Sequence, residues 1–155
     1  MKLEELVIRD ARPSDLPSLV AMYAADTLGG HSDTTDGAAD ADYLNAFNAI
    51  HASPNDTLYV AEIDGKVVGT FQATLITVMT GRGATNMKIE AVQTREDMRG
   101  SGIGSAMIRF AIEQARAAGA ASVQLSSNAA RHNAHRFYER LGFEKSHVAF
   151  KMKLK

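Results

Sequence analysis

The sequence predicts a single α/β domain of the α+β type, and three observations carry this prediction. The chain has 155 residues, of which 45% are hydrophobic and 23% are charged, proportions typical of one globular domain. Strand-like and helix-like segments follow one another without an internal repeat or a linker. An Asp-Gly pair between two apolar runs indicates a β-hairpin. We therefore assign residues 1–155 to one domain.

The N-terminal region predicts a strand followed by a helix. Residues 6–9 form a short apolar strand. Ser14 or Asp15 can cap the helix that follows, because their side-chain oxygens accept hydrogen bonds from free backbone amides. Gly29 and Gly30 end this helix.

The next segment, residues 31–42, predicts a mobile acidic loop containing Asp33, Asp36, Asp40 and Asp42. Two interpretations stay open. The four carboxylates can face a cationic substrate, or the loop is simply solvated and caps the next helix through Asp40. Apolar residues at helical spacing place that helix over residues 43–51, and Pro54 ends it.

The middle of the chain predicts three antiparallel strands. Residues 58–63 form the first, and Asp64-Gly65 tolerates the positive φ angles of a tight turn. The second strand runs over residues 66–79, and the Gly81–Gly83 turn leads into a third over residues 85–94. Alternation along this third strand places Glu90 among apolar neighbours and gives one face to Lys88, Glu90, Val92 and Thr94.

The C-terminal part predicts a long helix, a short strand, a last helix and a closing strand pair. Gly102 opens the long helix and Gly119 closes it. Residues 123–125 form the short strand, the last helix carries residues 134–141, and the closing pair ends at Leu154.

Composition excludes several classes of chemistry. Without cysteine, the chain has no thiol nucleophile, no thiolate zinc site and no iron–sulfur cluster. His132 and His135 stand at helical spacing, but without a third ligand we predict no metal site. Seventeen Lys and Arg against eighteen Asp and Glu give a net charge of −1, which argues against a nucleic-acid partner.

The beginning of the chain carries acids where a signal peptide needs an apolar stretch. No window of the sequence approaches 18 uninterrupted apolar residues. We therefore expect a soluble cytoplasmic protein without a membrane partner.

The most informative segment is the glycine-rich stretch from Arg99 to Ser105, which follows a strand and opens an amphipathic helix. Its three glycines let backbone N–H groups point at one spot, and the positive end of the helix dipole adds to them. A pyrophosphate fits such a cradle. The stretch does not match a nucleotide P-loop, because Ser105-Ala106 replaces the required Lys and Ser or Thr. It does not match a dinucleotide fingerprint either, because Ser105 stands at the third glycine position.

The pattern that fits is Arg or Gln, two residues, Gly, one residue, then Gly or Ala. On this pattern the chain resembles the GNAT superfamily of acetyl-coenzyme A dependent N-acetyltransferases. The opening Ile8-Arg9 and the tail from Ala134 to Phe143, which contains Phe137-Tyr138 and Leu141-Gly142-Phe143, agree with the same family. The resemblance implies a mixed, mostly antiparallel sheet of about seven strands flanked by about four helices. It also implies that the sheet splays between the strand holding Glu90 and the strand holding Val123.

The resemblance further implies that acetyl-coenzyme A is the co-substrate. Its pyrophosphate would bind at Arg99, Gly100, Ser101, Gly102, Ile103, Gly104 and Ser105, and its pantetheine arm would pair with backbone near Val92, Gln93 and Thr94. The family often has an asparagine where this chain has Arg131. Arg131 is therefore a candidate for a coenzyme phosphate, and Asn133 for pantetheine.

Two side chains are candidates for proton transfer. An amine with a pKa of about 10 is free in only about one molecule in a thousand at neutral pH, so a base is needed. Glu90 is the candidate, because it precedes Arg99 by the nine residues seen in the similar polyamine acetyltransferases; alternatively it is a structural acid paired with Lys88. Tyr138 matches the tyrosine that protonates the coenzyme A thiolate in the family, although it can also be a core residue with its hydroxyl at the rim.

We therefore expect transfer of acetyl from acetyl-coenzyme A to a primary amine of a small cationic acceptor, by direct attack within a ternary complex. Two alternatives stay open, a non-catalytic acyl-coenzyme A sensor or interaction module, and a protein-directed acetyltransferase. Ser126-Ser127 weakens the latter, because some protein-directed members place a glutamate there. The family often dimerises, and the sequence leaves a homodimer open.

Overall fold

The computed structural model describes residues 3–26, 28 and 32–155. The chain divides into two compact units, Met1–Gln124 and Leu125–Lys155. The strands are β1 (Val7–Asp10), β2 (Asp56–Ile63), β3 (Lys66–Thr77), β4 (Thr85–Thr94) and β5 (Ser122–Leu125). The helices are α1 (Leu16–Ala25), α2 (Asp40–Ala52), the single turn α3 (Thr80–Gly83), α4 (Ile103–Ala117) and α5 (His132–Arg140). Three short 3₁₀ turns cover Leu3–Glu5, Pro13–Asp15 and Glu96–Met98.

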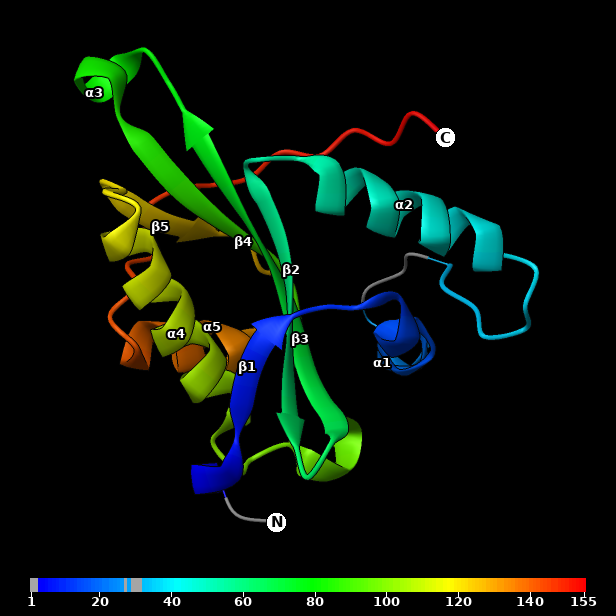
Figure 1. Cartoon of the computed structure of the whole chain (residues 1–155). Coiled ribbons are helices and arrows are strands. Elements are labelled where there is room, and N and C mark those ends of the chain that lie inside the picture. Colours follow the sequence, from blue (N-terminus) through cyan, green and yellow to red (C-terminus); the bar gives the residue numbers. More distant parts are fainter. Residues whose placement is uncertain (1–2, 27, 29–31) are drawn as a thin grey trace. The chain divides into compact units, whose positions relative to one another are not determined.

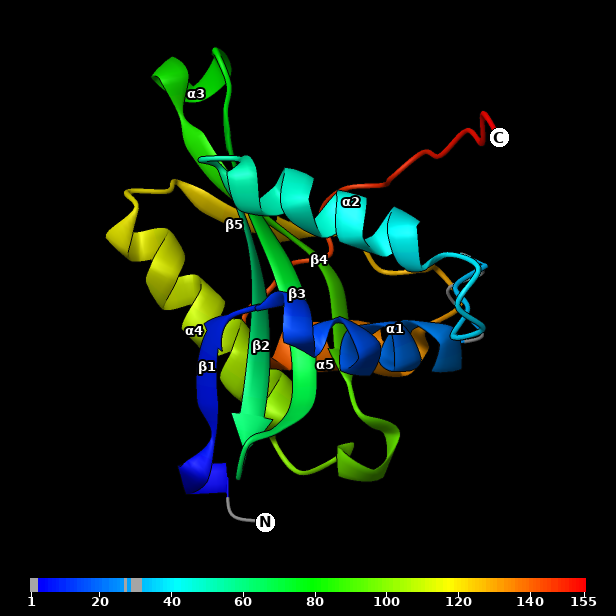
Figure 2. The same ribbon diagram turned by 45° about the vertical axis from the view of Figure 1, so that its right-hand side comes forward.

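The first unit is built on a sheet with the strand order β1-β2-β3-β4-β5. The pairs β1–β2, β2–β3 and β3–β4 are antiparallel. Helices α1 and α2 cover one face of this sheet, the α1/α2 face, and α4 covers the other, the α4 face (Figures 1 and 2). Leu19, Met22 and Phe47 of the two covering helices pack with Val60 of β2. On the α4 face the sheet meets Ile103 and Met107 of α4, which are buried.

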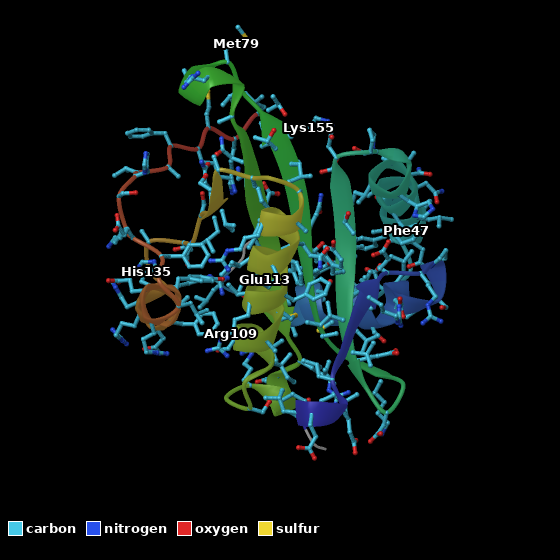
Figure 3. All side chains as sticks on the ribbon, turned by 60° about the vertical axis from the view of Figure 1, so that its left-hand side comes forward. Phe47, Met79, Arg109, Glu113, His135 and Lys155 are labelled. Atoms are coloured by element: carbon cyan, nitrogen blue, oxygen red, sulfur yellow. The ribbon has the colours of Figure 1, made fainter. Side chains whose placement is uncertain are left out.

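Two hairpins set the register of the sheet. The first turns at Asp64-Gly65, whose φ angles of 51° and 73° confirm the predicted tight turn. The second, β3–β4, has its strand bounds within two residues of those predicted, and it ends in α3, which extends beyond the neighbouring strands (Figure 1). Figure 3 shows Met79 at the free end of this hairpin.

Two predicted helix caps are wrong. The side chain of Asp15 makes no capping bond to α1; it accepts hydrogen bonds from Arg9 and from the backbone amide of Arg12 at 2.7 Å. Helix α2 begins at Asp40 itself, so Asp40 lies inside the helix and cannot cap it. The predicted stop at Gly29 and Gly30 falls outside the described residues, and α1 ends earlier, at Ala25.

The second unit contains α5, which ends with backbone hydrogen bonds around a glycine. Gly142 has a φ of 102°. Its backbone amide donates to the carbonyl of Glu139, and the backbone amide of Phe143 donates to the carbonyl of Tyr138. This pair of bonds is a Schellman motif, in which glycine takes the left-handed position that ends a helix. The predicted stop at Gly142 is therefore confirmed.

The α+β class and the four long helices are confirmed, but the strand count is not. The sheet has five strands where about seven were expected. Residues 143–155 are neither helix nor strand, so the predicted closing strand pair that ends at Leu154 is wrong. An alternating apolar pattern makes a strand only where a neighbouring strand supplies the ladder hydrogen bonds.

Candidate functional site

The glycine-rich stretch forms a turn that leads directly into α4. Gly100 and Gly102 have φ angles of 78° and 91°, and Gly102 is the residue immediately before the helix. The hydroxyl of Ser101 donates to the carbonyl of Met98, which closes the turn. Within the described residues, none of the six backbone N–H groups from Gly100 to Ser105 donates to a protein acceptor. Six free donors next to a helix N-terminus suit an anion with several oxygens, and we call residues 100–105 the amide cradle.

The cradle is fixed against the sheet by close packing at Gly69 of β3. A Cβ atom placed there would lie 2.9 Å from Sδ of Met107 and 3.2 Å from Cγ2 of Ile103. Both partners are fully buried. The first turn of α4 can approach the sheet this closely only because Gly69 has no side chain.

Strand β4 carries a β-bulge at the point where the predicted site residues lie. Gln72 of β3 lies opposite Glu90, whereas Thr70 lies opposite Gln93, so β4 has one extra residue between the two pairs. Ala91, inside this stretch, has a φ of 53°. A side chain at such a φ is uncommon and marks a locally constrained backbone.

The bulge changes which residues share a face with Glu90. Because Thr70 and Gln72 are two residues apart on β3, their partners Gln93 and Glu90 point to the same side. The prediction that Val92 and Thr94 share this face is therefore wrong, since one added residue reverses the alternation. Leu58, opposite Gln72, packs with the core under α1 and α2, so Glu90 and Gln93 lie on the α1/α2 face.

Glu90 forms an ion pair with Lys88, with Nζ and Oε1 3.3 Å apart. The side chains are 51% exposed for Glu90 and 42% for Lys88. Gln72, which lies opposite Glu90 on β3, is polar, and this corrects the expectation that Glu90 has apolar neighbours. A pair this exposed contributes little to stability, about 0–1 kcal/mol, and half of the Glu90 side chain stays in contact with solvent.

Strand β5 runs beside only the first part of β4. Strand β5 has four residues against the ten of β4, and it starts beside the beginning of β4, where the amide of Ala121 donates to Thr85 at 2.8 Å. Strand β5 can therefore accompany less than half of β4. In the described chain, Val92, Gln93 and Thr94 lie beyond its reach.

A group of acidic and phenolic side chains lies on the α1/α2 face. The side-chain amide of Gln93 donates a hydrogen bond to the carboxylate of Asp26 at 2.8 Å, and the hydroxyl of Tyr43 donates one to the carboxylate of Asp33 at 2.7 Å. Burial raises the pKa of Tyr23 above its usual value, and the negative charge of Asp33 acts in the same direction. Asp33 of the predicted acidic loop is thereby linked to α2 and lies close enough to α1 to affect Tyr23.

Tyr138 lies in the second unit, near the end of α5. Its ring meets that of Phe143 at a centroid distance of 5.9 Å, the apolar contact that accompanies the Schellman motif. Burial raises the pKa of the Tyr138 phenol above its ordinary value, and the positive charge of Arg131 acts in the opposite direction. A phenol with a raised pKa keeps its proton at neutral pH, as a proton donor must.

The two other candidates of the second unit lie at the start of α5. Arg131 immediately precedes the helix and is partly buried. Asn133 is exposed in the first turn, where its side-chain oxygen accepts a hydrogen bond from Arg136. Arg99 in the first unit is exposed as well.

Sequence analysis did not find one partly buried polar cluster. The two terminal nitrogens of Arg9 donate to the carboxylate of Asp15 at 2.7 and 2.9 Å, and one of them also donates to Glu62 at 3.0 Å. The hydrogen bond from Arg9 lowers the pKa of Asp15. Asp15 and Glu62 lie 6 and 53 positions from Arg9 in the chain, so no local motif announces them. The cluster joins β1, β2 and the turn before α1.

A surface cavity of about 900 Å³ adjoins this cluster. It lies between α1 and the turn of the first hairpin, and its lining includes Arg12, Lys66 and Arg95. Of the predicted site residues in the described chain, none lines it.

Neither a metal-binding cluster nor a membrane-spanning helix is found in the part of the chain that the structure describes. There is no group of three or more His, Asp or Glu side chains arranged to hold a metal ion. Over the same residues, no helix has the length and apolar character needed to cross a bilayer.

Comparison with known proteins agrees with this geometry. Residues 17–143 match the family model described as Acetyltransferase (GNAT) family. The chain belongs to the GNAT acetyltransferase family. A solved structure described as a transcriptional regulator from Bacillus halodurans C-125 superposes with a TM-score of 0.92 at 37% identity, and the match covers 96% of this chain and 99% of that one. A crystal structure of a Clostridium acetobutylicum protein with acetyl-coenzyme A shares the GNAT fold, with a TM-score of 0.73 at 18% identity, covering 96% of each chain.

Two curated relatives extend the comparison. The chain is 34% identical over 136 residues to the Xenopus tropicalis protein called Probable N-acetyltransferase camello, covering 86% of this chain. It is 44% identical over 63 residues to the aminoalkylphosphonate N-acetyltransferase of Salmonella typhimurium, covering 41% of this chain. The chain spans 60% of the length of the first relative and 41% of the second.

Proposed function

We propose that this GNAT protein transfers an acetyl group from acetyl-coenzyme A to a primary amine of a small cationic acceptor, by direct attack within a ternary complex. The observation that carries the proposal is the set of six free backbone amides from Gly100 to Ser105 at the start of α4. Their number and position suit the two phosphates of a pyrophosphate, and Arg99 adds a positive side chain beside them.

In this proposal the half of β4 that β5 does not reach receives the pantetheine arm. The backbone of Val92, Gln93 and Thr94 lies beyond the reach of β5, so its outward-facing groups suit the amides of an extended chain. Arg131 and Asn133 are the candidates in the second unit for a coenzyme phosphate and for pantetheine. Bound acetyl-coenzyme A supplies a thioester, whose carbonyl carbon forms the new C–N bond as its C–S bond breaks.

Glu90 accepts the proton that the attacking amine must lose. Its carboxylate is half exposed on the α1/α2 face, where water can carry the proton from the amine to it. The positive charge of Lys88 lies 3.3 Å from this carboxylate.

Tyr138 protonates the thiolate of coenzyme A that leaves when the C–S bond breaks. The thiolate, whose conjugate acid has a pKa of about 8.5, accepts this proton from the protonated phenol as the C–S bond breaks. Burial, which raises the pKa of Tyr138, keeps the phenol in this form.

The acceptor class rests on the carboxylates of the α1/α2 face. Asp26 is held by Gln93 and Asp33 by Tyr43, on the same face as Glu90. Carboxylates held in this way attract a protonated amine at long range and orient it at short range. The name of the Salmonella relative, an aminoalkylphosphonate N-acetyltransferase, supports a small amine.

The test is release of free thiol from acetyl-coenzyme A in the presence of a panel of polyamines, amino sugars, amino-acid derivatives and aminoalkylphosphonates. We expect at least one amine to accelerate release, with intersecting initial-velocity plots that indicate a ternary complex. Binding of acetyl-coenzyme A with no acceleration by any amine, and no effect of Tyr138→Phe, would mean that the chain is an acyl-coenzyme A sensor. Acceleration by peptides alone would mean a protein-directed enzyme.

The role of Glu90 is separated from that of a structural acid by a matched pair of variants. Glu90→Gln and Lys88→Gln each break the same ion pair, and each removes one charge from the same face. If Glu90 is the base, only Glu90→Gln lowers kcat, by about 100-fold or more. Equal effects of the two variants would leave Glu90 as the structural partner of Lys88.

A further inference from the structure

The surface cavity of about 900 Å³ between α1 and the turn of the first hairpin has no part in the proposed function. Its volume lies in the range of pockets that hold small organic molecules, about 300–1,000 Å³. The described residues that line it all belong to the first unit, Met1–Gln124, and none of them has a role in the proposed reaction. We call this space the α1 cavity.

Two positively charged side chains at the α1 cavity have no negative partner. Arg12 precedes the 3₁₀ turn before α1, and Lys66 is the first residue of β3. Within the described chain, neither side chain forms an ion pair or donates a hydrogen bond. The hydroxyls of Ser14 and Ser18 line the same cavity, and in the same part of the chain they also have no acceptor. Guanidinium, ammonium and hydroxyl groups together suit a carboxylate.

The other two cations at the α1 cavity are already neutralised. Arg9 is bound by Asp15 and by Glu62. Arg95 is bound by Asp97, with 2.6 Å between its Nε and a carboxylate oxygen. These contacts hold both arginines within the protein's own ion pairs. A ligand carboxylate therefore finds its cationic partners in the unpaired side chains described above.

The α1 cavity also has an unpaired negative group. Glu96 lines it and is exposed, and its carboxylate has no ion pair among the described residues. With Asp15, Glu62 and Asp97, it balances the four cations that line the cavity. The lining is thus neutral overall, yet it keeps unpaired groups of both signs. A ligand that itself carries both signs is complementary to such a lining.

Part of the wall of the α1 cavity is apolar. Ala21, Met22 and Ala25 of α1 line it, together with Val67 of β3. Met22 belongs to the buried core, and Val67 packs against the same core. The apolar wall is therefore held in place from behind, and an apolar group of a ligand that contacts it leaves water.

We propose that the α1 cavity binds a small zwitterion with an apolar side chain, which is a free amino acid or a dipeptide. Arg12 and Lys66 hold its carboxylate, Glu96 holds its ammonium group, and the wall at Met22 and Val67 receives its side chain. The site is separate from the amide cradle, and the proposal does not depend on the acetyltransferase reaction proposed above.

The first test titrates ¹⁵N-labelled protein with leucine and with leucyl-leucine, without acetyl-coenzyme A, and follows the backbone amide signals by NMR. We expect saturable shifts at Ser14, Ser18, Lys66 and Glu96 with at least one of these ligands. The ligand with the lower Kd identifies the source, because the two differ in the separation of their charges. The matched probes are isocaproate, which is leucine without its amino group, and isoamylamine, which is leucine without its carboxylate. Each should bind about 10-fold to 100-fold more weakly.

The second test removes the two kinds of charge from the protein. Arg12→Gln and Glu96→Gln should each raise Kd for the zwitterion by about 10-fold to 100-fold. Glu96→Gln should not weaken the binding of isocaproate, which has no ammonium group. The matched controls are Arg109→Gln and Glu113→Gln on α4, which does not line the cavity (Figure 3). Both controls should leave Kd unchanged, and circular dichroism shows whether all four variants are folded.

Shifts at the α1 cavity, weaker binding of both single-charge probes, and effects confined to Arg12→Gln and Glu96→Gln support the proposal. The absence of a saturable shift at about 10 mM of either zwitterion, a concentration above the Kd of even a weak specific site, would overturn it. Shifts that instead cluster at the amide cradle, or at Asp26 and Glu90, would overturn it too, and so would equal binding of the single-charge probes. None of these measurements uses enzymatic activity, so their failure leaves the proposed function untouched.

Discussion

Replacing Gly102 by alanine tests the amide cradle directly. Gly102 precedes α4 with a φ of 91°, a conformation that costs a residue with a side chain about 1–2 kcal/mol. A Cβ atom there would lie 3.1 Å from Cδ2 of Leu3, whose side chain is exposed and can move aside. Alanine also stiffens the unfolded chain, which returns about 0.4–1 kcal/mol. The free energy of unfolding should therefore fall by about 1 kcal/mol, which lowers the melting temperature by about 2–4 °C.

The effect on binding should be larger than the effect on folding. To relieve the strain, the backbone at Gly102 rotates, and this turns the amides on either side of it away from a bound anion. Losing one hydrogen bond to a charged group costs about 1.5–3 kcal/mol, which corresponds to a rise of about 10-fold to 100-fold in Kd. Isothermal titration calorimetry with acetyl-coenzyme A measures this change without requiring an acceptor.

The same helix provides the control for this experiment. Gly119 lies just beyond the other end of α4 with a φ of 74°, and a Cβ atom there would meet open space. Gly119→Ala therefore carries a similar conformational cost, but it lies at the C-terminal end, far from the cradle. We expect both variants to lose similar stability and only Gly102→Ala to lose affinity. Equal affinities for the two variants, or no binding by the unmodified chain, would refute the cradle.

Three further predictions follow from the structure. Tyr138→Phe should lower kcat by about 10-fold or more with little change in unfolding by urea. Because the pKa of the Tyr138 phenol is raised, kcat of the unmodified protein should fall only above about pH 10. A variant with unchanged kcat would contradict the role of Tyr138 as an acid. Asp15→Asn should destabilise the fold by about 3 kcal/mol at about pH 7, because it leaves Arg9 short of a partner. The pKa of Asp15 is lowered in the folded state, so the ion pair contributes its full stability above the unfolded pKa of about 3.9 and loses it as the pH falls through the folded pKa. Urea titrations at neutral pH and at about pH 3 should therefore show the difference in free energy of unfolding between the two proteins become small at low pH. A difference that persists at low pH would contradict this. Asp33→Lys should raise KM for a cationic acceptor by about 10-fold or more without changing KM for acetyl-coenzyme A. Asp36→Lys should have a weaker effect, because the carboxylate of Asp36 accepts a hydrogen bond from the backbone amide of Ala38 within the same loop. If neither variant changes KM for the acceptor, this loop does not contact the acceptor.

The features that sequence analysis predicted correctly depend on a few neighbouring residues. The Asp64-Gly65 turn, the bounds of β4 and the glycines at both ends of α4 are set by backbone conformations that specific residues favour. The glycine-rich turn before α4 belongs to the same class, because its residues are consecutive. The turn could therefore be located without a structure, and its binding of an anion stays a prediction.

The features that sequence analysis missed depend on residues far apart in the chain. Nothing in the composition of β4 announces a bulge, since alanine is an unusual residue for the φ of 53° at Ala91. Asp15 has the residue type of a helix cap, but the partly buried guanidinium of Arg9 from β1 competes for its carboxylate and forms two hydrogen bonds with it. A charge-assisted bidentate contact is stronger than a cap to a neutral amide, so the tertiary partner determines the outcome.

The bulge also bears on how two substrates of opposite charge can reach one strand. The cradle lies at the start of α4, whose buried residues Ile103 and Met107 pack on the α4 face. Glu90 and Gln93, and the carboxylate of Asp26 that Gln93 holds, lie on the α1/α2 face. Without the extra residue in β4, Gln93 would point toward the α4 face and could not reach Asp26. The bulge thus places Gln93 and Asp26 on the face opposite to the cradle. We predict that, in the proposed function, a polyphosphate and a cationic amine approach β4 from different faces and do not compete for the same groups.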